Sequence, residues 1–188
     1  MTLRAIRDIS VKDITTGSFL LGEERINLAL AGRSLVLVTS DDEPRRAAFI
    51  KRIACSYDND PEYRPVLSTT PRSTTDAALM RAINLAVGLS EKRTRYRLWQ
   101  DFEGYCTAQY DAGRRVLLIF EDAHLMNDAM LRLLHSLSTV VVKDDLAVPM
   151  ILSGGSELER RLQQMRHRAL CSRIGAHVRL RLMESRAA

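Results

Sequence analysis

Short apolar runs alternate with longer amphipathic stretches along this chain of 188 residues. The runs at 34–39, 115–120 and 148–153 consist mainly of Val, Leu, Ile and other apolar residues. Such runs are typical of strands that are buried on both faces of a parallel sheet. A shorter run at 65–68 indicates a further strand. These four segments are therefore predicted to form a central sheet.

Apolar residues at helical spacing predict five helices, at residues 23–31, 45–57, 73–87, 94–110 and 127–137. Pro44 suits the first turn of a helix, Ser73 or Thr74 is expected to cap the third helix, and Gly88 to end it. Alternating strands and helices imply right-handed βαβ units. We therefore predict one α/β domain over residues 1–188, a three-layer αβα sandwich with a largely parallel sheet.

Composition narrows the class of protein without changing this fold. The hydrophobic fraction of 46% and the charged fraction of 27% are ordinary for a globular chain. The apolar runs are shorter than the about 20 residues of a membrane-spanning helix, and the N-terminus lacks the features of a secretory signal. A cytoplasmic protein is therefore expected. Cys55, Cys106 and Cys171 form no C-x-x-C pair, which argues against a zinc site or a disulfide framework.

Positive charge is concentrated near the C-terminus. The chain has a net charge of +5, and its most basic region, residues 160–181, is rich in arginine. This region is either a solvated helix face or a surface that contacts a phosphate backbone or a neighbouring subunit. DNA is therefore one candidate partner, and the charge alone does not decide between these interpretations.

The residues just after each apolar run are candidate site residues, because open parallel sheets bind ligands beyond the carboxyl ends of their strands. Glu121 and Asp122 follow the run at 115–120. A P-loop ATPase needs such a pair at a strand tip, with Glu121 holding magnesium and Asp122 polarising the attacking water. For the nearby His124, a buried, hydrogen-bonded side chain is expected rather than a catalytic one.

The segment VLLIFEDAHLM at 116–126 resembles the Walker B region of AAA-type P-loop ATPases, in particular of the ExeA and TniB group of transposition and secretion ATPases. The segments VPMILSGGSELERRL at 148–162 and LCSRI at 170–174 match the continuation of that pattern. The resemblance covers about residues 19–182. It implies protein partners in a homo-oligomer or a complex with related subunits, and ATP with magnesium where the site functions. It also implies that Arg173 is an arginine finger; a surface arginine in a salt bridge is the alternative.

The chain departs from this family at the phosphate loop, the Walker A motif. The pattern GxxxxGK[ST] is replaced by SDDEPRRA at 40–47. The glycines that let backbone N–H groups wrap phosphates are missing, Arg46 stands at the lysine position, and Ala47 replaces the magnesium-binding hydroxyl. In addition, Glu121–Asp122 reverses the usual order of acids, so the shorter Asp122 displaces its carboxylate from a catalytic glutamate's position.

Three interpretations of this altered loop follow. Its three acids, Asp41, Asp42 and Glu43, repel a triphosphate, which predicts loss of ordinary ATP binding. Alternatively, Arg45 or Arg46 binds a phosphate in an altered mode, since arginine is a good bidentate phosphate ligand. The simplest interpretation is that the acids cap the following helix while both arginines are solvated.

Three functional hypotheses result. The first is a degenerate AAA-type subunit that acts as a regulatory or assembly module without ATP hydrolysis. It is also favoured because the few residues after 182 cannot supply the helical lid that the resemblance leads one to expect. The second is an active ATPase that regulates DNA transposition or the assembly of an envelope machine. The third is nucleic-acid binding without ATP.

Overall fold

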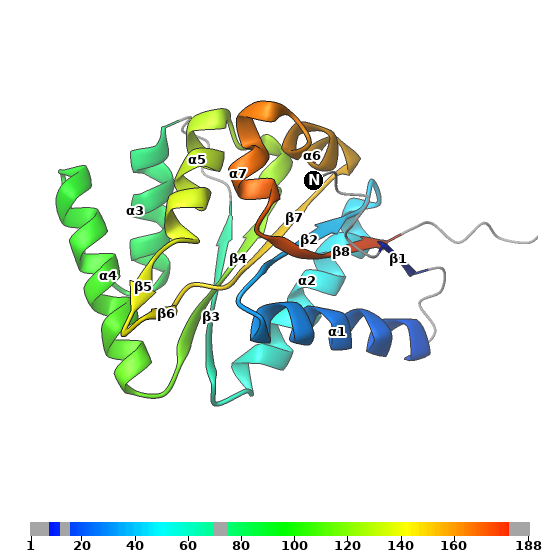
Figure 1. Ribbon diagram of the computed structural model, residues 1–188, viewed down its shortest axis with the longest axis horizontal. Helices are drawn as coiled ribbons and strands as arrows, with labels where there is room; N and C mark the ends of the chain where they lie inside the picture. The colour runs from blue at the N-terminus through cyan, green and yellow to red at the C-terminus, as the bar shows by residue number, and fades with distance from the viewer. Residues whose placement is uncertain (1–7, 12–15, 70–74, 181–188) are drawn as a thin grey trace, which may run out of the picture.

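The apolar runs form a central sheet of parallel strands, as their composition predicts (Figure 1). The structure, a computed structural model, describes residues 8–11, 16–69 and 75–180. Six strands lie in the order β1–β8–β2–β7–β4–β3, and each neighbouring pair is parallel. Their bounds are β1 (Asp8–Val11), β2 (Leu35–Thr39), β3 (Tyr63–Thr69), β4 (Arg115–Glu121), β7 (Met150–Gly154) and β8 (Ile174–Leu180).

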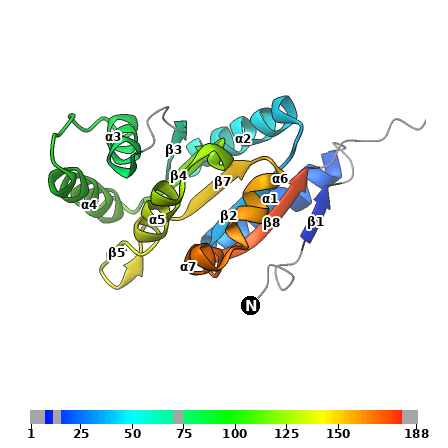
Figure 2. The same cartoon turned by 90° about the horizontal axis from the view of Figure 1, so that it is seen from above.

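Helices cover both faces of the sheet, which confirms the predicted three layers. One face is covered by α1 and α2, and the other by α3 to α7; Figure 2 shows α2 and α5 on opposite sides of the strands. Because side chains alternate along a strand, Leu37 of β2 enters one core and Val38 the other. The helices are α1 (Thr16–Ala31), α2 (Glu43–Asp58), α3 (Asp76–Ala86), α4 (Arg95–Asp111), α5 (Asp128–Leu137), α6 (Ser156–Leu162) and α7 (Arg168–Cys171).

The predicted helices and strands are confirmed, and most of their ends are shifted by one to three residues. The exception is α1, which begins at Thr16, seven residues before the predicted start. Pro44 does lie in the first turn of α2. β7 begins at Met150 rather than at residue 148, because Pro149 has no N–H to donate to a neighbouring strand. The stripe predicted along α4 is also confirmed, since Leu98 and Phe102 are fully buried in the larger core. Apolar periodicity thus located the elements better than their ends.

The start of α3 differs from the prediction. Thr75 is the N-cap residue, and its side chain accepts a hydrogen bond from the N–H of Ala78. The predicted cap at Ser73 or Thr74 is therefore wrong, and these two residues lie outside the described part of the chain. At the other end, Gly88 follows the helix with a φ of 82°, the left-handed conformation that favours glycine.

The sequence analysis missed strands β1 and β8, and a hairpin formed by β5 (Val141–Val142) and β6 (Asp145–Leu146). The hairpin turn places Lys143 and Asp144 at positive φ without glycine, so the usual turn signal is absent. Asp145 forms an ion pair with Arg33 and accepts a hydrogen bond from the Tyr110 hydroxyl at 3.4 Å. These contacts tie the hairpin to the turn before β2 and to α4.

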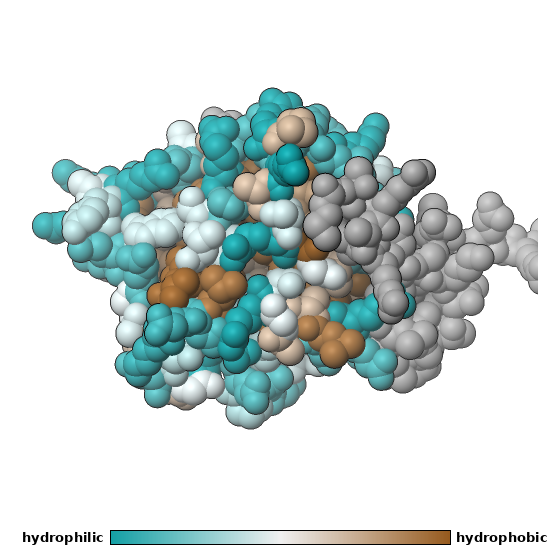
Figure 3. Space-filling model, viewed as in Figure 1, coloured by the Kyte–Doolittle hydropathy of each residue, from teal (hydrophilic) through white to brown (hydrophobic). Residues whose placement is uncertain are grey.

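The face of the molecule shown in Figure 3 is mainly hydrophilic, with small separate hydrophobic areas. The exposed large hydrophobic side chains belong to seven different elements. They are Leu28, Leu67, Leu85, Tyr96, Leu125, Val141 and Met165. None of the described helices has the length and apolarity required to cross a membrane.

Two leucines of α1 provide a matched test of the smaller core. Leu30 is fully buried, whereas Leu28 is 74% exposed. Leu30→Ala should lower the free energy of unfolding by about 2–5 kcal/mol, because it removes apolar contacts and leaves a cavity. Leu28→Ala should change it by less than about 0.5 kcal/mol. Urea unfolding measures both, and equal losses would contradict the packing of α1 described above.

Candidate functional site

The candidate residues meet at one edge of the sheet because the strands are parallel. At the carboxyl end of β2, Thr39 pairs with Gly154 of β7 and with Arg179 of β8. β4 lies on the far side of β7, where Phe120 pairs with Leu152. Glu121 and the residues that follow it therefore emerge beside the loop that leaves β2. This is the edge at which open parallel sheets bind ligands.

The loop from β2 to α2 is held by its own side chains. The Asp42 carboxylate accepts a hydrogen bond from the N–H of Arg45 at 3.1 Å and is the N-cap of α2. The Ser40 hydroxyl accepts a second one from the N–H of Asp42 at 3.2 Å. The predicted capping is thus confirmed for Asp42, while Glu43 supplies negative charge to the first turn.

Arg46 is buried in this loop, so the expectation that it is solvated is wrong. Its side chain is only 6% exposed. One guanidinium nitrogen donates to the carbonyl oxygen of Ser40 at 2.7 Å, and another to a carboxylate oxygen of Asp122 at 2.6 Å. The helical geometry of α2 turns Arg46 toward β4, where Asp122 supplies the opposite charge. Arg46 and Asp122, which the sequence analysis proposed as site residues for different reasons, are therefore in direct contact.

Asp41 caps a different helix from the one predicted. Its carboxylate accepts a hydrogen bond from the N–H of Ser156 at 2.8 Å, at the start of α6. The N-cap residue of α6 is Gly155, which has no side chain with which to cap the helix itself. Hydrogen bonds from the backbone and side chain of Ser156 hold the pKa of Asp41 below its ordinary value. The predicted cap on α2 is therefore wrong for Asp41.

The two acids after β4 lie in different environments. Burial, followed by the charge of Asp122, raises the pKa of Glu121, while Arg46 opposes this shift. Asp122 has a left-handed backbone, with φ 53° and ψ 36°, and its side chain is 38% exposed. No group of three or more His, Cys, Asp or Glu within the described ranges could hold a metal ion. Magnesium at a P-loop site needs only one or two protein carboxylates, so the assignment of Glu121 stays a prediction.

His124 lies in the short helix η2 (Ala123–Leu125), next to these acids. Its Nδ1 is 3.9 Å from an oxygen of Asp122, and its side chain is partly exposed. This nitrogen is enclosed but makes no hydrogen bond with any residue in the described segments. The expected buried, hydrogen-bonded histidine is therefore wrong for this ring nitrogen.

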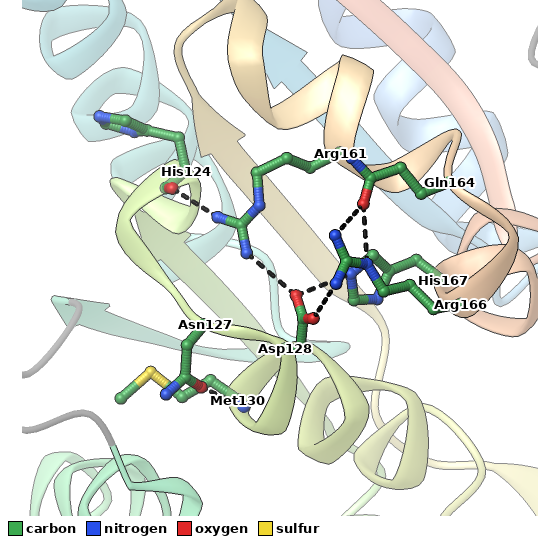
Figure 4. Close-up of polar contacts among 8 residues, drawn as sticks. All are labelled: His124, Asn127, Asp128, Met130, Arg161, Gln164, Arg166 and His167. Carbon is green, nitrogen blue, oxygen red and sulfur yellow. Dashed lines mark hydrogen bonds and ion pairs between the residues drawn. The ribbon is translucent and has the colours of Figure 1, made fainter.

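A cluster centred on Asp128 fixes the segment that follows β4 (Figure 4). The Asp128 carboxylate contacts Nε2 of His167 at 3.1 Å and accepts a hydrogen bond from Arg166 at 2.7 Å. Arg161 reaches the same carboxylate at 3.5 Å and donates to the carbonyl oxygen of His124 at 2.8 Å. The cluster thus links η2 and α5 to α6 and to η3 (Met165–His167).

The charge of Asp128 is supported by these partners. Burial opposes its ionisation, yet the hydrogen bond from His167 and the charge of Arg166 hold the pKa of Asp128 below its ordinary value. Arg166 is consequently part of the fold as well as of the basic surface. Sequence reasoning missed this cluster, because its members come from segments separated by more than thirty positions.

The structure places the two remaining candidate arginines differently. Arg45 is near the loop, with Nε 3.7 Å from an oxygen of Asp42. Arg173 precedes β8, and its carbonyl oxygen accepts a hydrogen bond from the N–H of Leu35 at the start of β2. It therefore lies at the amino end of the strands, away from Asp122. Its guanidinium donates to the carbonyl oxygen of Ser138 at 2.7 Å.

Beside the loop lies a hollow of about 360 Å³. His177 is buried there, and its Nε2 contacts the Thr39 hydroxyl at 2.8 Å. Glu159 of α6 accepts a hydrogen bond from Nε of Arg179 at 3.2 Å. The lining residues are Thr39, Ser40, Asp41, Asp42, Ser156, Glu159, Arg179 and Leu180. Of these, Ser40, Asp41 and Asp42 belong to the altered loop that the sequence analysis singled out, whereas Glu159 and Arg179 were not predicted to lie beside it.

The sheet order, the helix that leaves β2, and the acids after β4 define a P-loop NTPase-type α/β domain. The profile of the AAA domain family matches residues 29–162. This match covers more than half of the chain, and the protein therefore belongs to the AAA domain family. No curated protein sequence matches the chain significantly. The resemblance to the ExeA and TniB group stays a prediction.

Solved structures similar to this chain include ORC and Cdc6 proteins. The ADP form of the Aeropyrum pernix ORC2 protein has a TM-score of 0.64 at 12% identity, over 93% of this chain and 52% of its own. Cdc6p from Pyrobaculum aerophilum has a TM-score of 0.68 at 9% identity, over 90% and 46%. Drosophila ORC bound to DNA has a TM-score of 0.65 at 13% identity, and the match covers 91% of this chain and 31% of the ORC chain. These likenesses establish the fold, and this chain spans about half or less of those chains.

The cap formed by Asp41 predicts a pH dependence. Because its pKa is lower in the folded chain, its ionised form stabilises the fold above the ordinary value of 3.8, and this contribution is lost as the pH falls through the lowered pKa. Asp41→Asn should therefore be less stable than wild type at pH 7, and the difference should shrink below about pH 4.

Urea unfolding at pH 7, 5 and 3 measures this difference. Asp58→Asn is a matched control, because the Asp58 side chain is 67% exposed and lies 3.8 Å from Arg64. It reports the effect of losing one carboxylate elsewhere on the surface. A difference between wild type and Asp41→Asn that stays constant down to pH 3 would contradict a stabilising charge at the start of α6.

Proposed function

We propose that this chain is a degenerate AAA-type subunit that acts as a regulatory or assembly module and does not hydrolyse ATP. The observation that carries the proposal is the contact of buried Arg46 with the Ser40 carbonyl oxygen and with Asp122. Arg46, at the position of the family's lysine, and Asp122, the acid expected to polarise water, are thus paired with each other within the chain. We further propose that the protein works in the cytoplasm.

Carboxylates also cap the two helix N-termini at this edge. The N–H of Arg45 donates to Asp42 at the start of α2, and the N–H of Ser156 donates to Asp41 at the start of α6. A triphosphate would have to displace both carboxylates or lie close to them. Because like charges in a partly desolvated site cost several kcal/mol, displacement is unfavourable. The residues present therefore do not fit a triphosphate.

Magnesium chemistry lacks parts as well. Ala47 offers no hydroxyl to the metal, and Glu121 alone remains as an acid at the strand tip. Asp122 is held in an ion pair with Arg46, and an attacking water would compete with that pair. We therefore derive no hydrolytic step for this chain. Its AAA domain is proposed to serve through its surfaces, in a homo-oligomer or with related ATPase subunits.

Arg173 remains a proposed contribution to such an assembly. Its position at the amino end of β8 separates it from the phosphate loop of its own chain, as expected for a residue that acts on a neighbour. In the isolated subunit it donates to Ser138, and this hydrogen bond would have to open in the complex. Only an active neighbouring subunit would make Arg173 a catalytic residue.

Nucleotide binding provides the direct test. Fluorescently labelled ATP with magnesium should bind wild type with a dissociation constant weaker than about 1 mM, because the loop lacks the glycines of a phosphate loop and carries three acids. Phosphate release should not exceed the buffer blank, and the oligomeric state should be the same with and without nucleotide. Equilibrium titration and light scattering measure these quantities.

Two variants make the result specific. Arg46→Lys restores the family's lysine but no glycine, and it should not create binding. Asp122→Asn distinguishes the active-ATPase hypothesis, in which binding would persist while turnover disappears. Magnesium-dependent binding of ATP by wild type below about 100 μM, with turnover abolished in Asp122→Asn, would refute the proposal.

Binding of duplex DNA by the basic C-terminal region is a second candidate function. Arg160 and Arg168 are exposed and form no ion pair with the described acids, whereas Arg166 is engaged by Asp128. One similar structure is a Drosophila ORC that is bound to DNA. Exposed guanidinium groups are good ligands of backbone phosphates. DNA binding by this surface would not require a bound nucleotide.

The double variant Arg160→Ala with Arg168→Ala should weaken duplex binding and reduce the slope of log K against log salt by about 1.8, since two phosphate contacts are lost. Fluorescence anisotropy at several salt concentrations measures the slope. The charge-matched control is Arg64→Ala with Arg114→Ala, two exposed arginines near the amino ends of β3 and β4. If both double variants lower the salt slope equally, DNA is attracted by the overall positive charge and not by the C-terminal region.

A further inference from the structure

We propose that the corner between α3 and α4 binds single-stranded nucleic acid, independently of the phosphate loop. We define this α3–α4 corner by one residue of α3, the loop before α4 and the first turn of α4. Its members are Arg81, Glu91, Lys92, Arg93, Arg95, Tyr96 and Arg97. In both views of the ribbon, α4 lies at one end of the molecule, well apart from α6 (Figures 1 and 2).

The cations of this corner have two different roles. Arg95 pairs with Asp76 at 2.9 Å, which joins the first turns of α4 and α3, and Lys92 lies 3.8 Å from Asp101. These pairs hold the loop in its conformation. Arg93 and Arg97 are exposed and make no ion pair with any described carboxylate. Their charges are consequently available to a ligand.

A hollow of about 280 Å³ lies within the corner and is lined by Arg81, Glu91, Lys92 and Arg93. Nε of Arg81 is 3.5 Å from the carbonyl oxygen of Lys92, so cations from a helix and from a loop converge on one space. Three cations face a single carboxylate there. This excess of positive charge suits a phosphodiester group, and arginine supplies the preferred geometry for one.

Tyr96 decides which polyanion fits. Its side chain is 70% exposed, and its hydroxyl accepts a hydrogen bond from the Gln100 side chain at 2.7 Å, one turn later in α4. The ring is thus an oriented, solvent-exposed aromatic surface beside the cations. Proteins that bind single strands combine a positive groove with aromatic rings on which unpaired bases stack. A duplex or an acidic peptide offers no such base to this ring.

The test uses the full chain and a fluorescein-labelled oligothymidine of twenty nucleotides. Tyr96→Ala should weaken binding roughly tenfold or more, since one base–aromatic stack is lost, and should leave the salt slope unchanged. Tyr96→Phe should bind like wild type. Arg93→Ala with Arg97→Ala should reduce the slope of log K against log salt by about 1.4, because two contacts to a single strand disappear. All of these side chains are exposed, and circular dichroism checks that each variant folds.

Three comparisons identify other outcomes. Arg160→Ala with Arg168→Ala should leave oligothymidine binding unchanged; loss in this variant, with the corner variants unaffected, would overturn the inference and favour the C-terminal region. A duplex of equal length that binds as tightly as oligothymidine would overturn the inference. Polyglutamate that displaces oligothymidine equally well from wild type and from Tyr96→Ala would overturn it too. Absence of binding at low salt would also refute it. None of these results depends on whether ATP binds.

Discussion

Two-sided burial of parallel strands is the constraint on which the other features depend. β2 is buried along its whole length, with Leu37 in one core and Val38 in the other. Because β2 is parallel to its neighbours, its carboxyl end lies at the same edge of the sheet as theirs. The loop after Thr39 therefore lies beside the residues that follow β4, and every proposed property of this edge follows from that juxtaposition.

At this edge, side chains occupy the groups that a phosphate would otherwise use. A P-loop leaves backbone N–H groups and a cation open to a ligand. Here the carboxylates of Asp41 and Asp42 accept from helix N-termini, and Arg46 is bound by Ser40 and Asp122. The Arg46 charge is thus paired within the chain, and the first turns of α2 and α6 are each capped by a carboxylate. Such a site is stable as it stands, which is consistent with a protein that acts through its surfaces.

Much of the fold could be predicted because burial leaves a local record in the sequence. The apolar run at 115–120 and the helical spacing at 94–110 each specify an element, whereas the hairpin at Lys143 and Asp144 has unusual turn residues and left no signal. The parallel arrangement also led us to look for site residues just after each apolar run, and Asp122 does contact Arg46 of the segment that follows β2. Partners were harder, because the contact of Arg46 with Asp122 joins residues 76 positions apart and depends on three-dimensional proximity.

The position of β2 also has a consequence for the order of events during synthesis. Its neighbours in the sheet, β7 and β8, follow it by more than a hundred residues. At about 5–20 residues per second, the ribosome exposes this largely apolar strand roughly 5–25 s before either neighbour is made. Its backbone donors and acceptors stay unpaired for that interval, in which association with another chain competes with folding. Newly made protein, rather than mature protein, is thus the species that needs protection by chaperones.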